Sequence, residues 1–171
     1  MGIGIPGSGK TTVLKEFARK NRYGYVCPDD IREEMTGDST DQSKNREVWE
    51  EAYKRLQKKL ADGENVVFDA TFAFPGARKQ LINFARQNGA EKIQGIYLDV
   101  GLETAKERNN LRERKVPDFI LERMQDGLDR APLGIEEGFD LIVTLDKEQE
   151  LIDAEMKKEN KVLHKEFGTI H

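Results

Sequence analysis

The stretch that decides the fold is Gly4-Ile-Pro-Gly-Ser-Gly-Lys-Thr11, which follows a short apolar run at the amino end of the chain. It has the spacing of a phosphate-binding loop: a glycine, four residues, then Gly-Lys and a serine or threonine. Glycines let the backbone turn so that successive N–H groups face inward and cradle an anion, and the helix that follows adds its positive amino end. The stretch therefore predicts a site for the phosphates of a nucleotide.

Each side chain of this loop has an expected part in holding ATP or GTP. Lys10 reaches the outer phosphates and takes part in catalysis, while the Thr11 hydroxyl ligates Mg²⁺. The remaining contacts with the nucleotide are expected from Gly7, Ser8, Gly9 and Thr12. A glycine turn can match the pattern by chance, but this one lies between an apolar run and an amphipathic helix, as the chemistry requires. We therefore interpret the loop as a nucleotide site.

The chain that follows the loop alternates short apolar runs with longer amphipathic ones. This rhythm is typical of an α/β protein in which helices cover both faces of a parallel sheet. It predicts the three-layer fold of P-loop NTPases with five strands, over residues 1–4, 23–27, 66–69, 93–100 and 139–145. Helices are expected over residues 10–21, 45–61, 75–87, 103–114 and 117–129, with a further one from 147.

The domain organisation is predicted to be simple. No segment rich in Gly, Pro or Ser divides the chain, so we expect one domain over residues 1–171, with a helical lid over about 103–117. The charged tail, about 157–171, is expected either to be disordered or to dock as a last helix or strand. Only three residues precede Gly4, and the sequence leaves open whether the natural chain begins before Met1.

Composition limits the classes of function. The chain has 171 residues, and its 28 Lys and Arg against 32 Asp and Glu give a net charge of -4. A protein that coats long nucleic acids draws its affinity from a basic excess, so that class is excluded, although a short end of a nucleic acid is not. The single Cys27 cannot form an internal disulfide, and no run approaches the ~20 apolar residues of a membrane span. We therefore expect a cytoplasmic protein with no membrane partner.

Acidic residues follow two of the expected strands, at the edge where parallel sheets gather their chemistry. Asp69 ends the run Val-Val-Phe-Asp, where we expect it to serve Mg²⁺ directly or through water, or else to be a turn residue. Asp29 comes after the second strand and can accept the proton of an attacking hydroxyl. Arg32, one helical turn later, can grip an anionic part of the acceptor. The alternative is helix capping, which needs only Asp30 and leaves Asp29 free.

Arginines gather in the segment Glu107-Arg-Asn-Asn-Leu-Arg-Glu-Arg-Lys115. Arg108 and Arg112 share a helical face, which fits a lid that closes on the phosphates of the nucleotide and stabilises the charge of the transferring group. The alternative is a solvated surface helix on which nearby glutamates pair with the arginines. Arg78 is a weaker candidate for contact with the acceptor. Trp49 and Tyr53, four residues apart, are expected to pack in the core or to line an acceptor groove.

These residues resemble a known family, the small P-loop kinases found as the kinase domain of bacteriophage and bacterial polynucleotide 5′-kinases. The resemblance runs from Gly4 to about Leu145 and rests on four motifs in order. They are GIPGSGKTT at 4–12, DDIR at 29–32, VVFDAT at 66–71 with Arg78 following, and RNNLRERKVP at 108–117. All P-loop kinases share the first motif, and the spacing of the other three points to this branch.

The resemblance implies roles for the residues of these motifs. The phosphate loop would bind the β- and γ-phosphates and Mg²⁺. Asp29 would be the general base for the acceptor 5′-hydroxyl, and Arg32 would hold the adjacent phosphate of the acceptor. Asp69 would help to order the site, and Arg112 would be the lid arginine on the donor phosphates.

The chain departs from the family pattern at two points. Pro28 stands where the phage member has an arginine, so one contact with nucleic acid is missing. The lid is one residue shorter before its proline, which leaves Arg112 and Arg114 as competitors for the lid role.

The leading hypothesis is an ATP-dependent kinase that acts on the 5′-hydroxyl end of DNA or RNA. The nearest alternative is a kinase of the same fold with a small acceptor, such as a nucleotide sugar in the manner of zeta-type toxins, a nucleoside or an antibiotic. A nucleotide-binding switch without an acceptor site is the third. The sequence leaves open the choice between ATP and GTP, between DNA and RNA, and the oligomeric state.

Overall fold

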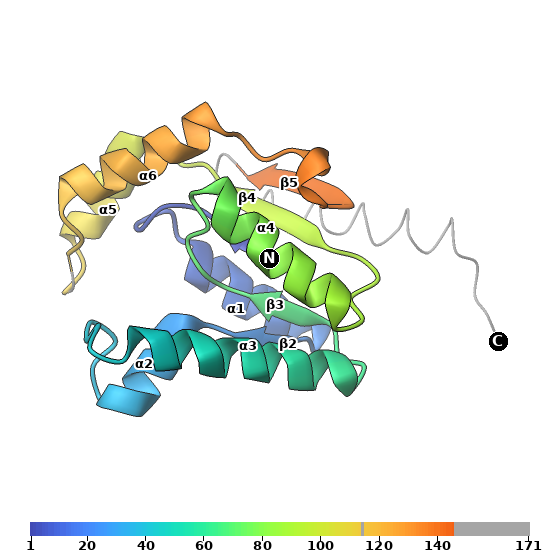
Figure 1. Ribbon diagram of the computed structural model, residues 1–171. Helices are drawn as coiled ribbons and strands as arrows, with labels where there is room; N and C mark the ends of the chain where they lie inside the picture. The colour runs from blue at the N-terminus through green and yellow to red at the C-terminus, as the bar shows by residue number, and fades with distance from the viewer. Residues whose placement is uncertain (114, 146–171) are drawn as a thin grey trace.

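The computed structural model describes residues 1–113 and 115–145, and within them five parallel strands form the centre of the molecule (Figure 1). The strand order is β2-β3-β1-β4-β5, because β2 pairs with β3, β1 pairs with β4, β4 pairs with β5, and a bridge between Gly2 and Asp69 joins β1 to β3. The strands are β1 (Gly2–Ile3), β2 (Gly24–Val26), β3 (Val66–Phe68), β4 (Gln94–Leu98) and β5 (Leu141–Leu145). The predicted α/β fold of P-loop kinases is confirmed.

Within the described residues, six α-helices and one 3₁₀ turn cover this sheet. They are α1 (Lys10–Asn21), α2 (Pro28–Thr36), α3 (Asn45–Ala61), α4 (Pro75–Gln87), α5 (Leu102–Asn110), α6 (Asp118–Arg130) and η1 (Ile135–Glu137). α1, α3 and α4 have the predicted bounds, whereas α5 ends four residues before the expected position 114. The helix expected from residue 147, the tail at 157–171 and Arg114 lie outside the described residues.

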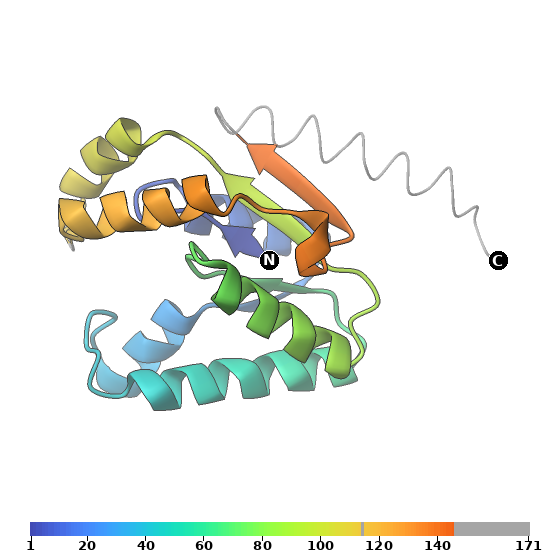
Figure 2. The same cartoon turned by 45° about the horizontal axis from the view of Figure 1, so that its top comes forward.

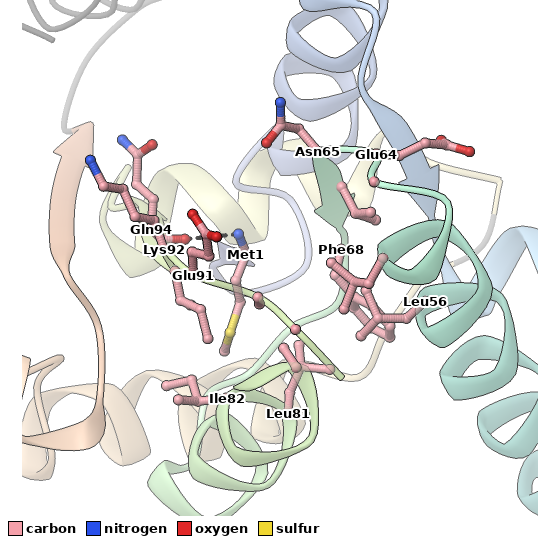
Figure 3. A pocket seen from close by; sticks show the side chains of 17 residues that line it. Met1, Leu56, Glu64, Asn65, Phe68, Leu81, Ile82, Glu91, Lys92 and Gln94 are labelled. Atoms are coloured by element: carbon pink, nitrogen blue, oxygen red, sulfur yellow. Dashed lines mark hydrogen bonds between the residues drawn. The ribbon is translucent and has the colours of Figure 1, made fainter. Parts of the chain in front are cut away.

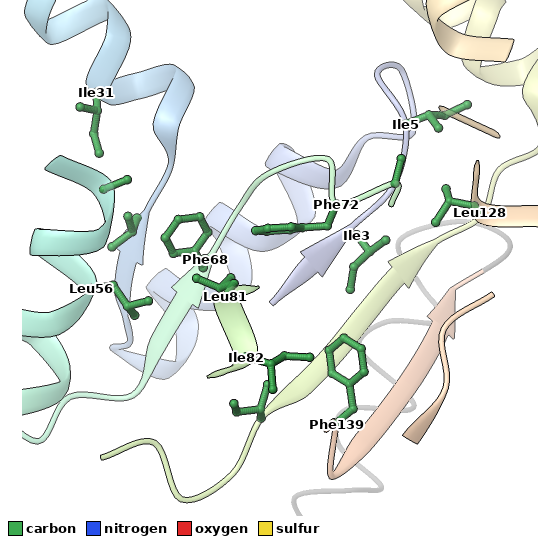
Figure 4. Packing of buried hydrophobic residues seen from close by; sticks show 14 of the residues in the cluster. Ile3, Ile5, Ile31, Leu56, Phe68, Phe72, Leu81, Ile82, Leu128 and Phe139 are labelled. Carbon is green, nitrogen blue, oxygen red and sulfur yellow. The ribbon is translucent and has the colours of Figure 1, made fainter. Parts of the chain in front are cut away.

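Alternation along the strands divides the core into two layers. Val67, Ile96 and Leu98 face α1, where they pack with Leu14 and Ala18. Their neighbours in sequence face the other way, as the period of two in a strand requires. On that second side the strands meet α3 and α4 in a larger cluster (Figure 4), which includes Ile3, Phe68, Phe72, Leu81, Ile82 and Phe139.

Trp49 and Tyr53 pack against this second layer, which confirms the predicted core packing. The Trp49 ring lies 6.2 Å from Phe68 in a stacked arrangement, and the Tyr53 ring meets Phe84 edge to face at 4.7 Å. Trp49 also lines the cavity described below.

A cavity of about 460 Å³ opens at the amino edge of the sheet, between β3, β4 and the helices α3 and α4 (Figure 3). Its floor is apolar, with Leu56, Phe68 and Ile82, and the Met1 amine at its side donates to the Gln94 carbonyl at 2.8 Å. The phosphate loop emerges at the other edge of the sheet. This cavity is therefore separate from the candidate site.

α5 and α6 pack on each other beside the phosphate loop (Figure 2). The loop after α2 and the start of α3 lie across from them, so the carboxyl edge of the sheet is flanked on two sides. Along residues 1–113 and 115–145, none of the helices is both long and apolar enough for a membrane span.

Candidate functional site

The phosphate loop adopts the conformation that its glycines predict. Gly7 and Gly9 have φ angles of 87° and 83°, in the left-handed region that favours glycine. A Cβ atom on Gly7 would lie 2.2 Å from the carbonyl oxygen of Ala105, so this glycine also permits the close approach of α5. The α1 helix begins at Lys10 with no side-chain cap and no acidic residue in its first turn, which leaves its first N–H groups available to an anion.

The Ser8 side chain also indicates that the loop binds a ligand. Its hydroxyl is buried and has no hydrogen-bond partner among the described residues. Burying a hydroxyl without a partner is costly, so such a group usually marks the place of a bound molecule or water. Its position inside the loop fits a phosphate oxygen.

Lys10 forms an ion pair with Asp69, the acidic residue that follows β3. The Lys10 ammonium lies 2.7 Å from Asp69 Oδ1, and the Tyr25 hydroxyl donates to Oδ2 at 2.6 Å. Burial alone would raise the pKa of Asp69, but the Lys10 charge and hydrogen bonds from Lys10, Tyr25 and Thr11 outweigh it and lower the pKa. Asp69 is therefore a buried, ionised carboxylate at the foot of the loop.

This oxygen-rich arrangement fits a magnesium ion that arrives with the nucleotide. Thr11 supplies a hydroxyl at the start of α1, and its hydrogen bond to Asp69 connects the two predicted magnesium residues. Because both oxygens of Asp69 already accept from Lys10 and Tyr25, a contact through water suits this residue better than direct ligation. Among residues 1–113 and 115–145, no group of three His, Cys, Asp or Glu side chains forms a separate metal site.

Asp29 and Arg32 lie together at the start of α2, as their spacing predicted. The Asp29 carboxylate is exposed and accepts a hydrogen bond from Arg32 Nη1. The Arg32 guanidinium is buried and also donates to the Asn45 side chain at 3.0 Å. Its Nε is buried without a partner, which leaves one N–H for a ligand.

The capping alternative for Asp30 is wrong. α2 begins at Pro28, its N-cap is Cys27, and no side chain caps it. Asp30 instead pairs with Lys15 at 2.8 Å on the surface. The proline fixes the first helical position, so the helix starts three residues earlier than a cap at Asp30 would allow. Asp29 remains unused by capping.

The expectation for Arg78 is corrected by its surroundings. This guanidinium is 0% exposed and donates five hydrogen bonds, two of them to Glu137 at 2.7 Å. The other three go to carbonyl oxygens of Phe72, Ala73 and Ala131. With every N–H occupied and no exposure, Arg78 has no donor to offer an acceptor. It joins α4 to η1 and to the end of α6.

Arg108 and Arg112 lie on the opposite side of the loop from α2. Arg108 Nη1 comes within 3.9 Å of the place where a Cβ of Gly9 would be. Within the described part of the chain, neither arginine forms an ion pair, and Glu103 pairs with Lys106 instead. The alternative in which nearby glutamates neutralise these arginines therefore finds no support.

One cavity of about 880 Å³ brings these groups together. The phosphate loop forms one wall, Asp29 and Arg32 a second, and Arg108 and Arg112 a third. A smaller cavity of about 210 Å³ leads from Lys10 and Asp69 to a largely apolar end lined by Trp49, Phe72, Phe74, Ala77 and Met124. A nucleotide and an acceptor could thus meet between Lys10 and Asp29.

Sequence reasoning missed Tyr25, Asn45 and Asn109. Tyr25 is one of three residues of a short strand, and nothing in the sequence shows that its hydroxyl meets Asp69, 44 positions away. Asn45 starts α3, and only the packing of α3 on α2 brings it to Arg32. Asn109 stood among charged residues, where a polar side chain gives no signal of burial.

Comparison with known proteins gives a family model described as an AAA domain, which matches residues 1–131. Among curated proteins, the L-seryl-tRNA(Sec) kinase of Methanococcus maripaludis is 26% identical over 140 residues, which are 74% of this chain and 50% of that protein. A protein of Acanthamoeba polyphaga mimivirus, named as a bifunctional polynucleotide phosphatase/kinase, is 26% identical over 110 residues, 64% of this chain and 23% of its own. The chain thus spans half or less of these relatives.

Solved structures share the fold. The structure of the Pnkp1/Rnl/Hen1 RNA repair complex superposes with a TM-score of 0.69 at 22% identity, over 81% of this chain and 45% of that one. Shikimate kinase from Bacteroides thetaiotaomicron gives a TM-score of 0.62 at 20% identity, over 95% of this chain and 96% of its own. At these identities the likeness establishes the fold alone.

Proposed function

This chain belongs to the AAA domain family and has the fold of P-loop kinases, and on that premise we propose that it transfers the γ-phosphoryl group of ATP to the 5′-hydroxyl end of DNA or RNA. The observation that carries the proposal is the pairing of Asp29 with the buried Arg32 across one cavity from the phosphate loop. A nucleotide switch needs neither residue at that place.

The nucleotide side of the site rests on the phosphate loop. The free N–H groups at the start of α1 and the Ser8 hydroxyl hold phosphate oxygens, and Lys10 exchanges part of its contact with Asp69 for the outer phosphates. Thr11, and Asp69 through water, would hold Mg²⁺, which would neutralise charge on the outer phosphates of the nucleotide. Arg108 and Arg112 bring further positive charge to the same oxygens.

The acceptor side rests on Asp29 and Arg32. Asp29 takes the proton of the attacking 5′-hydroxyl as the oxygen forms its bond to the γ-phosphorus, and the bond from that phosphorus to ADP breaks. Arg32, which lines the cavity and whose buried Nε has no partner among the described residues, holds a phosphate of the acceptor through its guanidinium. Its contact with Asp29 orients the carboxylate toward the cavity.

The relatives support a kinase but differ in acceptor. One is named for a polynucleotide substrate and another for the seryl group of a tRNA. A small-molecule acceptor is the second candidate, and the observation that favours it is the small volume of the side cavity, about 210 Å³, next to Lys10 and Asp29. The net charge of -4 agrees with either acceptor, because the end of a nucleic acid presents few phosphates.

The test is transfer of label from γ-labelled ATP to a panel of 5′-hydroxyl DNA and RNA oligonucleotides and of small hydroxyl compounds. We expect label on oligonucleotides and a loss of about 10²- to 10⁴-fold in turnover for Asp29→Asn, with ATP affinity preserved. Asp30→Asn is the matched control, because the Asp30 carboxylate follows Asp29 directly in the sequence but pairs with Lys15 on the surface. It should keep turnover within about twofold of the parent protein.

Each other outcome has a defined meaning. Label on small compounds alone would replace the polynucleotide with the second candidate. ATP binding without any transfer would support the switch. Unchanged turnover in Asp29→Asn would remove Asp29 from the role of general base.

A further inference from the structure

Asn109 is a buried polar residue in the exposed last turn of α5. Its side chain is 0% exposed, whereas its neighbours Arg108 and Asn110 are exposed. The amide Nδ2 donates to the Val116 carbonyl at 2.8 Å, and the Val116 N–H donates to Asn109 Oδ1 at 3.1 Å. The side chain therefore pairs with both polar groups of one peptide residue, as a neighbouring strand would.

The same residue also holds the start of the loop that leads from α5 to α6. The Asn109 carbonyl accepts from the Arg112 N–H at 3.1 Å, just beyond the end of the helix. We call the described residues that follow α5, 111–113 with 115 and 116, the arginine loop, and Asn109 fastens it at Arg112 and at Val116. Arg112 forms no ion pair among the described residues, so its position depends on the backbone that carries it.

The helix that carries Asn109 is itself fixed on the phosphate loop. Ala105 is 0% exposed, and its carbonyl packs so close to Gly7 that no Cβ could fit between them. Val116, the partner of Asn109, lines the same 880 Å³ cavity as Arg112. Asn109 therefore lies at the boundary between α5, which is fixed on the phosphate loop, and the arginine loop that follows it.

From this geometry we propose that Asn109 is a positioning residue, whose amide fastens the arginine loop at Val116 and so sets where Arg112 meets the donor phosphates. The expected effect of Asn109 on turnover rests on the proposed function, whereas its hydrogen bonds to Val116 do not depend on that function. An apolar side chain of similar size would fill the space but would leave the Val116 N–H and carbonyl without partners.

The first test is a double-mutant cycle on phosphoryl transfer. Asn109→Ala should lower kcat by about 10- to 100-fold through misplacement of Arg112, and thermal unfolding should show a folded protein. In an Arg112→Ala background the same change should lower kcat less than about twofold further, because the residue acts through that arginine. Asn110→Ala is the matched control, an exposed asparagine at the next position, and should leave kcat unchanged. Fully multiplicative losses in the cycle would overturn the proposal.

The second test is amide hydrogen exchange at Val116, which needs no acceptor. The Val116 N–H should be protected in the parent protein and in Asn110→Ala, and should lose protection in Asn109→Ala. Asn109→Asp keeps an acceptor for this N–H and should retain part of the protection and part of the turnover. If Asn109→Ala does not fold, Asn109→Asp replaces it in both the kcat measurement and the hydrogen-exchange measurement. Equal protection in all variants would overturn the proposal. If the parent transfers no phosphate at all, the proposed function fails while this exchange test still decides the role of Asn109 in the loop.

Discussion

Two buried arginines, Arg32 and Arg78, show how burial alone fails to identify a ligand-binding side chain. Both are within 4% of complete burial. Arg78 uses all five N–H groups on protein acceptors, whereas Arg32 keeps its Nε unpaired beside a cavity. A guanidinium whose hydrogen bonds are complete holds elements together, and one with a spare donor in a cavity can receive an anion.

The lid arginines provide a prediction at this scale. Arg112 lines the cavity beside the phosphate loop, so we expect Arg112→Ala to reduce turnover by about 10²- to 10³-fold, and more than Arg114→Ala does. The measurement is kcat with saturating ATP for both variants. The reverse order would assign the lid role to Arg114.

Asp69 leads to a prediction on pH. Its pKa in the folded protein is lowered, so its ion pair adds stability above the ordinary aspartate range, near pH 4, and this is lost as pH falls through the lowered pKa. Asp69→Asn should cost roughly 3–5 kcal/mol of the free energy of unfolding at pH 7, and the difference from the parent should shrink below about pH 4. Urea unfolding at several pH values measures it. A difference that stays constant with pH would contradict the assignment, and Asp62→Asn, at an exposed pair with Lys58, is the control.

At the scale of elements, the Arg78–Glu137 pair and the other hydrogen bonds of Arg78 join three segments that are separated in the sequence. Arg78 belongs to α4, Glu137 to η1, and the Ala131 carbonyl follows α6. α5 is thus fixed on the phosphate loop, and the end of α6 is fixed on α4. The elements around the cavity are held by contacts outside it.

We expect Arg78→Met to lower the free energy of unfolding by about 3–5 kcal/mol, because it leaves Glu137 buried without its partner. Arg78→Met with Glu137→Gln should recover part of this loss, since the second change removes the unpaired charge. Denaturant unfolding gives the values, and Arg46→Ala, at an exposed pair with Glu50, should cost less than about 1 kcal/mol. A loss in Arg78→Met no larger than in this control would show that the pair is not needed.

At the scale of the whole molecule, charge limits how much of an acceptor the protein can bind. The chain carries a net charge of -4, and the cations that face the cavity are Lys10 and the arginines 32, 108 and 112. Those on the nucleotide side are occupied by ATP in the proposed reaction. Under the proposed function, we therefore expect a nucleic acid to be held mainly through the phosphates nearest its 5′ end.

This leads to a prediction on substrate length. The KM for a 5′-hydroxyl oligonucleotide should change less than about threefold between about four and about twenty nucleotides, and its salt dependence should correspond to only one or two phosphates. Steady-state transfer at several salt concentrations measures both. A KM that falls steadily with length would indicate an extended basic track that the described residues do not provide.

How much the sequence predicts depends on whether a feature is local. The phosphate loop, the bounds of α1, α3 and α4, and the Asp29–Arg32 pair are all set by residues within one or two turns of each other. Strand order depends on contacts between distant segments, and the sequence did not predict it. The start of α2 was not predicted either, because Pro28 at the first helical position prevailed over a capping pattern at Asp30.

The sequence by itself determined that this chain binds phosphates and folds as helices on a parallel sheet, because glycine spacing and apolar periodicity are written in neighbouring residues. Only the tertiary structure decided which polar side chains serve that site. Tyr25 meets Asp69, Arg78 turns to Glu137 and Asn109 closes the arginine loop through contacts whose partners the sequence does not name. Hydrogen-bond partners of buried groups depend on which elements pack together, and that packing is a property of the whole fold.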